Sequence, residues 1–287
     1  MPMCDMEKAH FVILPVAYER TTSYRKGTAR GPAKFLEASH QLEFYDEELA
    51  GETAKLIAIA TAPIFKPSAK EADHKFLKIV SSAVAELVRR KKFVATIGGE
   101  HTLTYAPILA YAQVYADLSI LYVDAHADLR NEYEGTPWSH ACALRRSLEA
   151  CRLFGGQGRT SMVGIRSMDI EEARYIGDNQ NLALFGMAQS YRLCDLADSI
   201  IERLGEHVYV SIDLDGLDPA VIPGVGTPQP GGLGWYDLLY LLKKLFERRR
   251  VVGVDLMELA PIAGQVISEF AAAKLLYRII GYSWKNQ

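Results

Sequence analysis

Short apolar runs, many of them rich in β-branched residues, alternate along the chain with longer segments whose apolar residues recur at the period of a helix. Such runs, separated by helices, are typical of a parallel sheet that is covered on both faces. We expect eight strands, at residues 11–16, 56–60, 93–97, 119–123, 161–165, 182–185, 208–212 and 251–256. We expect eight helices, at residues 32–39, 71–90, 103–115, 140–150, 170–178, 195–204, 235–247 and 265–282.

The pattern leaves the closure of this sheet open. Eight strands that alternate with helices are compatible with a barrel and with an open, doubly wound sheet, and periodicity does not distinguish the two. The sequence contains no linker rich in Pro, Gly or Ser, no repeat and no low-complexity tract. We therefore expect one α/β domain over residues 1–287.

Composition and charge fit a globular protein and exclude several other classes. Lys and Arg number 32 against 35 Asp and Glu, which gives a formal net charge of −3, and 49% of the residues are hydrophobic. A disordered chain would be less apolar, and a nucleic-acid-binding protein would carry an excess of basic residues. The sequence has no window of 18 uncharged apolar residues, so we expect no membrane span.

The N-terminal segment and the cysteines favour the cytoplasm. The first ten residues include Asp5, Glu7 and Lys8 and lack the apolar stretch of a signal peptide. The four cysteines, at positions 4, 142, 151 and 194, form no CxxC pair. They are typical of reduced thiols rather than of disulfides or a zinc site.

Polar residues gather directly after four of the expected strands. Ligands bind at the carboxyl ends of strands in barrels and in open α/β sheets, so these segments form the candidate site. They are GGEH at residues 98–101, DAHAD at 124–128, DLD at 213–215, and Glu258.

Acidic residues and histidines in these segments predict a metal site. Asp124, His126 and Asp128 are two residues apart, so an extended segment would project all three from one face. Asp213 and Asp215 repeat the spacing at another strand end. Carboxylates that lie together suppress one another's ionisation unless a cation binds, and oxygen ligands with some imidazole suit Mn²⁺ or a related ion. The candidate ligands are His101, Asp124, His126, Asp128, Asp213 and Asp215.

Taken in order, the segments resemble the signature blocks of the ureohydrolases, the arginase and agmatinase family. The blocks are GGEH (98–101), DAHAD (124–128), SIDLDGLDP (211–219) and MELAP (257–261), with SYRKGTARGP (23–32) near the N-terminus. SHACALRR (139–146) resembles the agmatinase branch. The resemblance implies a three-layer α/β sandwich with a mostly parallel eight-stranded sheet and helices on both faces. It also implies two Mn²⁺ ions per subunit and a homo-oligomer.

The resemblance further implies how the ligands are shared. One manganese ion would be held by His101, Asp124, Asp128 and Asp213, and the other by Asp124, His126, Asp213 and Asp215. Asp124 and Asp213 would then bridge the pair. Two ions that share a water molecule lower its pKa and supply hydroxide near neutral pH. The expected reaction is attack of this metal-bridging hydroxide on a guanidinium carbon.

Three residues are expected to take part in catalysis. Glu258 would hydrogen-bond the substrate guanidinium, because a carboxylate accepts paired N–H donors from a planar cation. His140 would carry a proton to the departing amine, a role that suits imidazole with its pKa of about 6.5. Asp128, beside the metal ions, would help to stabilise the tetrahedral intermediate electrostatically.

The loop at residues 129–140 is expected to select the guanidine. Glu132, Tyr133 and Glu134 suit a substrate with a second positive charge, such as agmatine, whereas Arg130 would favour a carboxylate. The agmatinase-like block favours agmatine, whose hydrolysis gives putrescine and urea, a reaction of polyamine biosynthesis. The alternatives are another guanidine such as guanidinobutyrate or arginine, and a metal-binding relative without turnover. A two-metal phosphatase fits less well, because the blocks occur in ureohydrolase order.

Three positions depart from the family pattern. Position 100 is Glu where many relatives carry Asp, position 102 is Thr where Ser is common, and Gln229 stands where Glu is frequent. None of the three is an expected metal ligand. We therefore expect them to alter the surroundings of the site rather than its ability to bind metal.

Overall fold

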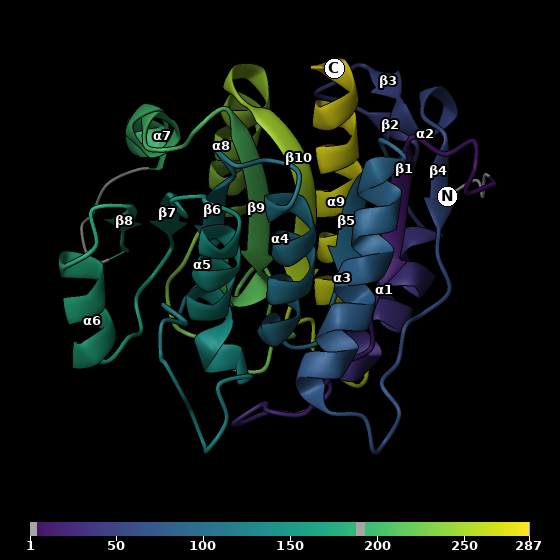
Figure 1. The fold of residues 1–287 in the computed structure, drawn as a ribbon. Helices are drawn as coiled ribbons and strands as arrows, with labels where there is room; N and C mark the ends of the chain where they lie inside the picture. The colour runs from purple at the N-terminus through teal and green to yellow at the C-terminus, as the bar shows by residue number, and fades with distance from the viewer. Residues whose placement is uncertain (1–4, 188–192, 287) are drawn as a thin grey trace.

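The computed structural model describes residues 5–187 and 193–286, and its centre is an eight-stranded sheet (Figure 1). The strand order is β4-β1-β5-β10-β9-β6-β7-β8, and every neighbouring pair runs parallel. With β4 at one edge and β8 at the other, the sheet is open, which decides between the two expected architectures. The strands are β1 (Phe11–Pro15), β4 (Ile59–Thr61), β5 (Phe93–Ile97), β6 (Ser119–Val123), β7 (Thr160–Val163), β8 (Leu182–Phe185), β9 (His207–Asp213) and β10 (Arg250–Met257).

Helices cover both faces of the sheet, as the sequence predicts. One apolar core lies between the sheet and α1 (Gly31–Ser39), α7 (Leu193–Glu202), α8 (Trp235–Arg248) and α9 (Ile267–Lys285). A second core lies between the sheet and α3 (Asp73–Arg89), α4 (Tyr105–Ala112), α5 (Ala143–Leu153) and α6 (Ile170–Gly177). In Figure 1, α3, α4 and α5 lie in front of the sheet, and α8 and α9 lie behind it. The fold is a three-layer α/β sandwich.

This layering explains why the strands are apolar without interruption. Successive side chains of a strand point to opposite faces of its sheet. In β1, Phe11 and Ile13 enter the first core, and Val12 and Leu14 enter the second. All five residues of β1 are buried, so neither face offers a place for a polar side chain.

Two segments near residue 50 differ from the predicted elements. The strand expected at residues 56–60 begins later, as β4, because Leu56 ends a short helix, α2 (Thr53–Leu56). A tertiary contact holds this helix, in which the backbone N–H of Ala54 donates to the hydroxyl of Tyr277 at 3.0 Å. The sequence also gives no sign of the hairpin formed by β2 (Tyr45–Asp46) and β3 (Gly51–Glu52), since strands of two residues leave no alternating pattern.

Two of the expected helices begin as 3₁₀ turns that carry candidate site residues. The turn η2 (His101–Thr104) precedes α4, and the turn η3 (His140–Cys142) precedes α5. Cys142, Cys151 and Cys194 are free thiols, and Cys4 lies outside the described residues. Within the described ranges, no helix combines the length and apolar character needed to cross a membrane.

Candidate metal centre and active site

Four neighbouring strands bring the candidate residues together. β5, β10, β9 and β6 lie side by side in the centre of the parallel sheet (Figure 1), so their carboxyl ends share one edge. Leu256 of β10 is in register with Ile97 of β5 and with Ile212 of β9, and the next pair is Met257 with Asp213. Segments that are far apart in the sequence therefore deliver their polar residues to one place.

His101 faces three aspartates at this edge. Its Nδ1 atom lies 2.9 Å from Asp124 Oδ2, 3.1 Å from Asp213 Oδ2 and 3.3 Å from Asp128 Oδ2. Its ring is stacked on Tyr122, with the ring centroids 4.9 Å apart. All four members of the group are buried, so their charges are removed from water.

His126 forms a second group with Asp215 and Asp124. Its Nδ1 atom lies 3.1 Å from Asp215 Oδ2 and 3.5 Å from Asp124 Oδ1. Both groups have the composition and spacing to hold a metal ion, the first through His101, Asp124 and Asp213. Asp124 belongs to both and turns one oxygen toward each histidine. The structure thus presents two adjacent sets of ligands that share a carboxylate.

Local hydrogen bonds link the residues that are spaced two apart. The backbone N–H of His126 donates to Asp124 Oδ1 at 2.6 Å, and that of Asp215 donates to Asp213 Oδ1 at 2.8 Å. Each aspartate thereby closes a turn over the residue two places later. The expected extended segment is wrong at Asp128, whose φ of 52° is left-handed. Its carboxylate still reaches the cluster, where it accepts the hydroxyl of Tyr122 at 2.8 Å.

A serine and a buried acid support His101 on its other side. Ser211 Oγ donates to Asp255 Oδ1 at 2.8 Å and lies 3.0 Å from His101 Nε2. Because the serine proton goes to Asp255, Ser211 accepts from Nε2, which leaves Nδ1 of a neutral imidazole bare toward the aspartates. Burial raises the pKa of Asp255 to about 6. Neither residue is predicted from the sequence, although an acid within the apolar run 251–256 is a signal of a buried role.

The cluster is short of positive charge. Burial opposes a charged imidazole, yet hydrogen bonds to the aspartates, Asp124 first, raise the pKa of His101 well above its usual value. Burial also opposes a charged His126, but hydrogen bonds to Asp124 and Asp215 and the charges of these two residues raise its pKa to about 12. Burial and repulsion from Asp215 and Asp124 raise the pKa of Asp213. Asp124 Oδ2 is buried and receives no well-aligned hydrogen bond from the described residues. These features are those of a donor set that would be stabilised by a divalent cation.

Glu258 lies directly after β10 and is buried beside the first ligand group. Its φ is 65°, and its Oε1 accepts the backbone N–H of His101 at 2.7 Å. Burial and the nearby carboxylate of Glu100 raise the pKa of Glu258 well above its usual value. Glu258 therefore lies next to the candidate metal ligands, and its contact with a guanidinium stays a prediction.

His140 opens η3 and lies between two hydroxyl groups. Thr21 Oγ1 is 3.4 Å from its Nδ1 atom, and Ser23 Oγ is 3.3 Å from its Nε2 atom. Tyr133 meets the imidazole edge-on, with the ring centroids 6.2 Å apart. His140 is a member of neither candidate ligand group, and its role in proton transfer stays a prediction.

The loop at residues 129–140 presents its acids to solvent and engages its arginine. Arg130 Nη1 lies 3.0 Å from Asp169 Oδ2, and the guanidinium lies 4.9 Å from the ring centroid of Tyr133. Glu132 and Glu134 are exposed and form no ion pair with the described residues. The cation that would favour a substrate carboxylate is thus already paired.

Gln229, one of the three departures from the family pattern, lies at the second ligand group. Its Nε2 atom is 3.4 Å from His126 Nε2. Arg166 Nη2 donates to the carbonyl oxygens of Gln229 and Asp215, at 2.9 Å and 2.8 Å. This arginine therefore ties the glycine-rich turn around Gln229 to the end of β9.

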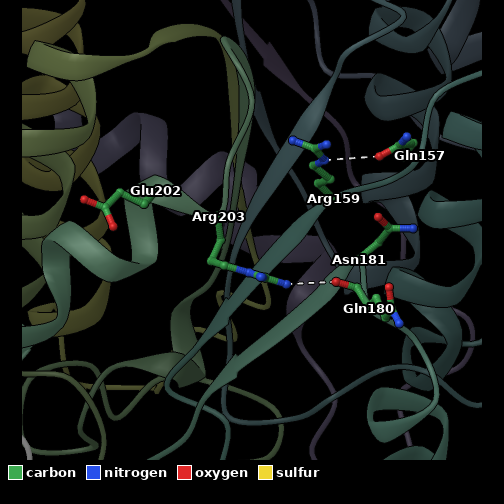
Figure 2. Close-up of a pocket in the computed structure, with 6 residues that line it drawn as sticks. All are labelled: Gln157, Arg159, Gln180, Asn181, Glu202 and Arg203. Atoms are coloured by element: carbon green, nitrogen blue, oxygen red, sulfur yellow. Dashed lines mark hydrogen bonds between the residues drawn. The ribbon is translucent and has the colours of Figure 1, made fainter.

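A separate cavity lies near the amino ends of β7 and β8, away from the candidate metal centre; Figure 2 shows the residues that line it. Its volume is about 600 Å³, and Arg159 and Asn181 in its lining directly precede β7 and β8. Arg159 donates to Gln157, and Arg203 donates to the carbonyl oxygen of Gln180. None of the predicted site residues lines it, so this cavity is distinct from the candidate metal centre.

Comparisons with known proteins identify a family and several similar proteins. The profile described as "Arginase family" matches residues 9–281. An N(1)-aminopropylagmatine ureohydrolase from Synechocystis sp. is 40% identical, over 97% of this chain and 90% of that protein. An agmatinase from Pyrococcus horikoshii is 32% identical, over 99% and 95%. The solved agmatine ureohydrolase of Thermoplasma volcanium has a TM-score of 0.83 at 30% identity and covers 98% of this chain and 92% of its own.

Proposed function

Because the chain belongs to the arginase family and is a ureohydrolase, we propose that it hydrolyses the guanidinium group of agmatine to urea and putrescine. The observation that carries the proposal is the pair of ligand groups at the ends of the central strands, with Glu258 beside them.

The donor set fits two divalent ions. Four buried aspartates face only two imidazoles, and Asp124 Oδ2 has no well-aligned hydrogen bond within the described residues. One ion would be held by His101, Asp124, Asp128 and Asp213, and the other by Asp124, His126, Asp213 and Asp215. Oxygen-rich sets that include imidazole suit Mn²⁺. When bound, such a pair of ions acidifies a shared water molecule and so supplies hydroxide near neutral pH.

Glu258 would bind and orient the guanidinium. Its Oε1 atom already accepts the N–H of His101, so the carboxylate is fixed relative to the ligand groups. A planar guanidinium donates parallel N–H bonds to a carboxylate, which gives it one orientation. Held in this way, its carbon atom faces the water that is to attack it. Asp128, in the first ligand group, would stabilise positive charge in the tetrahedral intermediate.

His140 would complete the reaction by proton transfer. Addition of hydroxide to the guanidinium carbon gives a tetrahedral intermediate, and breaking its C–N bond to the alkyl chain requires a proton on the departing nitrogen. The imidazole has hydroxyl partners at both nitrogens and lies outside the ligand groups, so it is able to give up a proton without losing a metal contact.

The loop at residues 129–140 supports an amine at the far end of the substrate. Glu132 and Glu134 are exposed and acidic, whereas Arg130 is paired with Asp169. Arginine and guanidinobutyrate carry a carboxylate at this end, which the two acids would repel. Agmatine carries an ammonium group instead.

N1-aminopropylagmatine is a second candidate, because it is the substrate in the name of the relative that is 40% identical. It extends agmatine by a further amine. Beyond its guanidinium this molecule carries two amines, and the loop has two exposed acids, one for each amine. The two candidates differ only in the length and charge beyond the guanidinium, so the proposed chemistry is the same.

A panel of guanidines assayed for urea with Mn²⁺ present tests the proposal. We expect kcat/KM to be highest for agmatine or its aminopropyl derivative and far lower for arginine and guanidinobutyrate. Replacement of both acids by glutamine (Glu132→Gln with Glu134→Gln) should raise KM most for the longer amine if that is the substrate. Fastest turnover of arginine or guanidinobutyrate would overturn the substrate assignment. Binding without urea release, or release of phosphate from phosphate esters, would overturn the proposed activity.

A further inference from the structure

Glu100 joins the end of β5 to the segment that precedes α1. The carboxylate is fully buried, and its Oε2 accepts the backbone N–H groups of Arg20 and Thr21, each at 2.7 Å. Its Oε1 accepts the hydroxyl of Thr21 at 2.7 Å. Gly99 allows this approach, because a Cβ atom there would lie 1.8 Å from the carbonyl oxygen of Tyr18. The departure from Asp to Glu at position 100 therefore has a specific partner in Thr21.

The Thr21 hydroxyl has no bonding capacity left over. A hydroxyl offers one proton and two lone pairs. The proton goes to Glu100 at 2.7 Å, and one lone pair accepts the backbone N–H of His140 at 3.0 Å. The remaining lone pair faces His140 Nδ1 at 3.4 Å. Toward the imidazole, Thr21 is consequently able to accept a hydrogen bond but not to donate one.

This count determines which imidazole nitrogen carries the proton. We propose that Thr21, held by Glu100, is a positioning residue that fixes neutral His140 as its Nδ1–H tautomer and leaves Nε2 to take up and release the catalytic proton. The inference rests on the proposed role of His140 in ureohydrolysis. It adds Thr21 and Glu100, which belong to neither candidate ligand group, to the residues that serve proton transfer.

The opposite tautomer would be costly at Glu100. If Nε2 carried the proton, Nδ1 would need a donor, and Thr21 would have to withdraw its proton from Glu100. A buried carboxylate would then lose its short hydroxyl donor, and such charge-assisted bonds are the stronger ones. Ser23, the partner of Nε2, does not favour either tautomer. Its hydroxyl is held by no other recorded partner in the described residues, so it is able to donate to bare Nε2 or to accept from Nε2–H.

A double-mutant cycle on the manganese-loaded enzyme tests the inference. Thr21→Val keeps the shape of the side chain and removes the hydroxyl. We expect kcat to fall by about tenfold, part of the roughly 10²–10⁴-fold contribution of general acid–base catalysis, with KM and metal content unchanged. Thr21→Ser should restore kcat. In a His140→Ala background, Thr21→Val should cause no further loss, because its effect runs through the imidazole.

Thr102→Val is the matched control. Thr102 also donates to Glu100 Oε1, at 3.1 Å, but its other partner is the carbonyl oxygen of Trp138 rather than the imidazole. Whatever its effect on kcat, we expect that effect to be equal in the two backgrounds. Losses from Thr21→Val that multiply with those from His140→Ala would overturn the inference, because Thr21 would then act on structure alone.

A second measurement reads the tautomer without activity. We would record imidazole ¹⁵N chemical shifts in the full-length protein loaded with diamagnetic Zn²⁺, and assign His140 by its loss in His140→Ala. We expect an Nδ1–H tautomer that gives way to Nε2–H in Thr21→Val and persists in Thr102→Val. An Nε2–H tautomer in the unmodified protein would overturn the inference. The expected tautomer in a protein that releases no urea would instead count against the proposed function alone.

Discussion

Carboxylates gather at two places in this molecule, and their counter-charges differ. At the strand ends, Asp124 and its neighbours surround His101 and His126. On the opposite margin of the fold, the Arg278 cluster joins Asp46, Glu47 and Glu48 to a guanidinium of α9 that is only 3% exposed. Arg278 Nε lies 2.8 Å from Asp46, its Nη2 lies 2.7 Å from Glu47, and its Nη1 contacts Glu48.

The comparison teaches how a buried acidic cluster is assigned to structure or to chemistry. A guanidinium is always protonated, so the Arg278 cluster carries its own counter-charge and ties the β2–β3 hairpin to α9. Imidazole gives up its proton, and neutral imidazole is a metal ligand. The strand-end cluster thus has the composition of a site for an exchangeable cation, whereas the Arg278 cluster contains a permanent one.

The largest expected effect separates the two clusters by metal content. Asp124→Asn removes the carboxylate shared by both ligand groups, so we expect metal and urea release to be lost together. Asp46→Asn, the matched change in the Arg278 cluster, should retain both. Elemental analysis and a urea assay measure the outcome. Two metal ions per chain and normal turnover in Asp124→Asn would refute the assignment of the shared ligand.

Within the site, a substitution outside the ligand groups should spare the metal. We expect His140→Ala to keep both ions and to lower kcat by roughly 10²–10⁴, the usual scale of general acid–base catalysis. Elemental analysis alongside steady-state kinetics distinguishes it from Asp124→Asn. An unchanged kcat would remove His140 from the mechanism.

The Arg278 cluster should respond in stability rather than in turnover. Arg278→Met leaves three carboxylates without their buried cation, and we expect the free energy of unfolding to fall by about 3–5 kcal/mol. Turnover per folded molecule should persist. Denaturant unfolding measures the change, and Arg248→Met, which breaks an exposed pair with Asp198, serves as the control with little effect. Equal stability of the two variants would show that the Arg278 cluster does not hold the fold.

The smallest expected effect is a dependence on pH. Burial opposes ionisation of Glu48, but hydrogen bonds from Tyr282 and Lys243 and the charge of Arg278 hold its pKa below the usual value. A lowered carboxyl pKa contributes stability above the unfolded pKa of about 4.3 and loses it as pH falls through the folded value. Glu48→Gln should therefore destabilise the protein at pH 7 and have a shrinking effect below pH 4. Denaturant unfolding across this range would contradict the idea if the difference grew on acidification.

The sequence predicts the strands and the ligand cluster because both follow from strong local patterns. β5 and β6 match their predicted bounds, since each is a buried apolar run that ends in a polar block. The strand order β5-β10-β9-β6 brings the polar blocks after these strands to one edge of the sheet. The sequence predicts the shared edge, because the strands are parallel, but it does not predict which strands are neighbours. The four candidate ligand aspartates could be predicted from the sequence, because their two-residue spacing is itself a recognisable pattern.

The residues around the candidate ligands could not be predicted from the sequence in this way. Ser211 and Thr21 are ordinary hydroxyl residues, and their partners Asp255, Glu100 and His140 come from distant parts of the chain. The hairpin of β2 and β3 escapes prediction for a similar reason, because a guanidinium more than two hundred residues away stabilises it. Contacts between residues so far apart in the sequence produce no periodic pattern of apolar and polar residues.

The order of the central strands also affects how the chain folds during synthesis. β5 pairs with β10, and β6 pairs with β9, so each half of the ligand set waits for a partner made much later. A nascent chain that ends at Asp128 holds His101 and Asp124 but lacks Asp213 and Glu258. Closing such long loops is slow, and it precedes any reward from the contacts it makes. A cation that needs all of these candidate ligands would therefore be bound only after both strand pairings have formed.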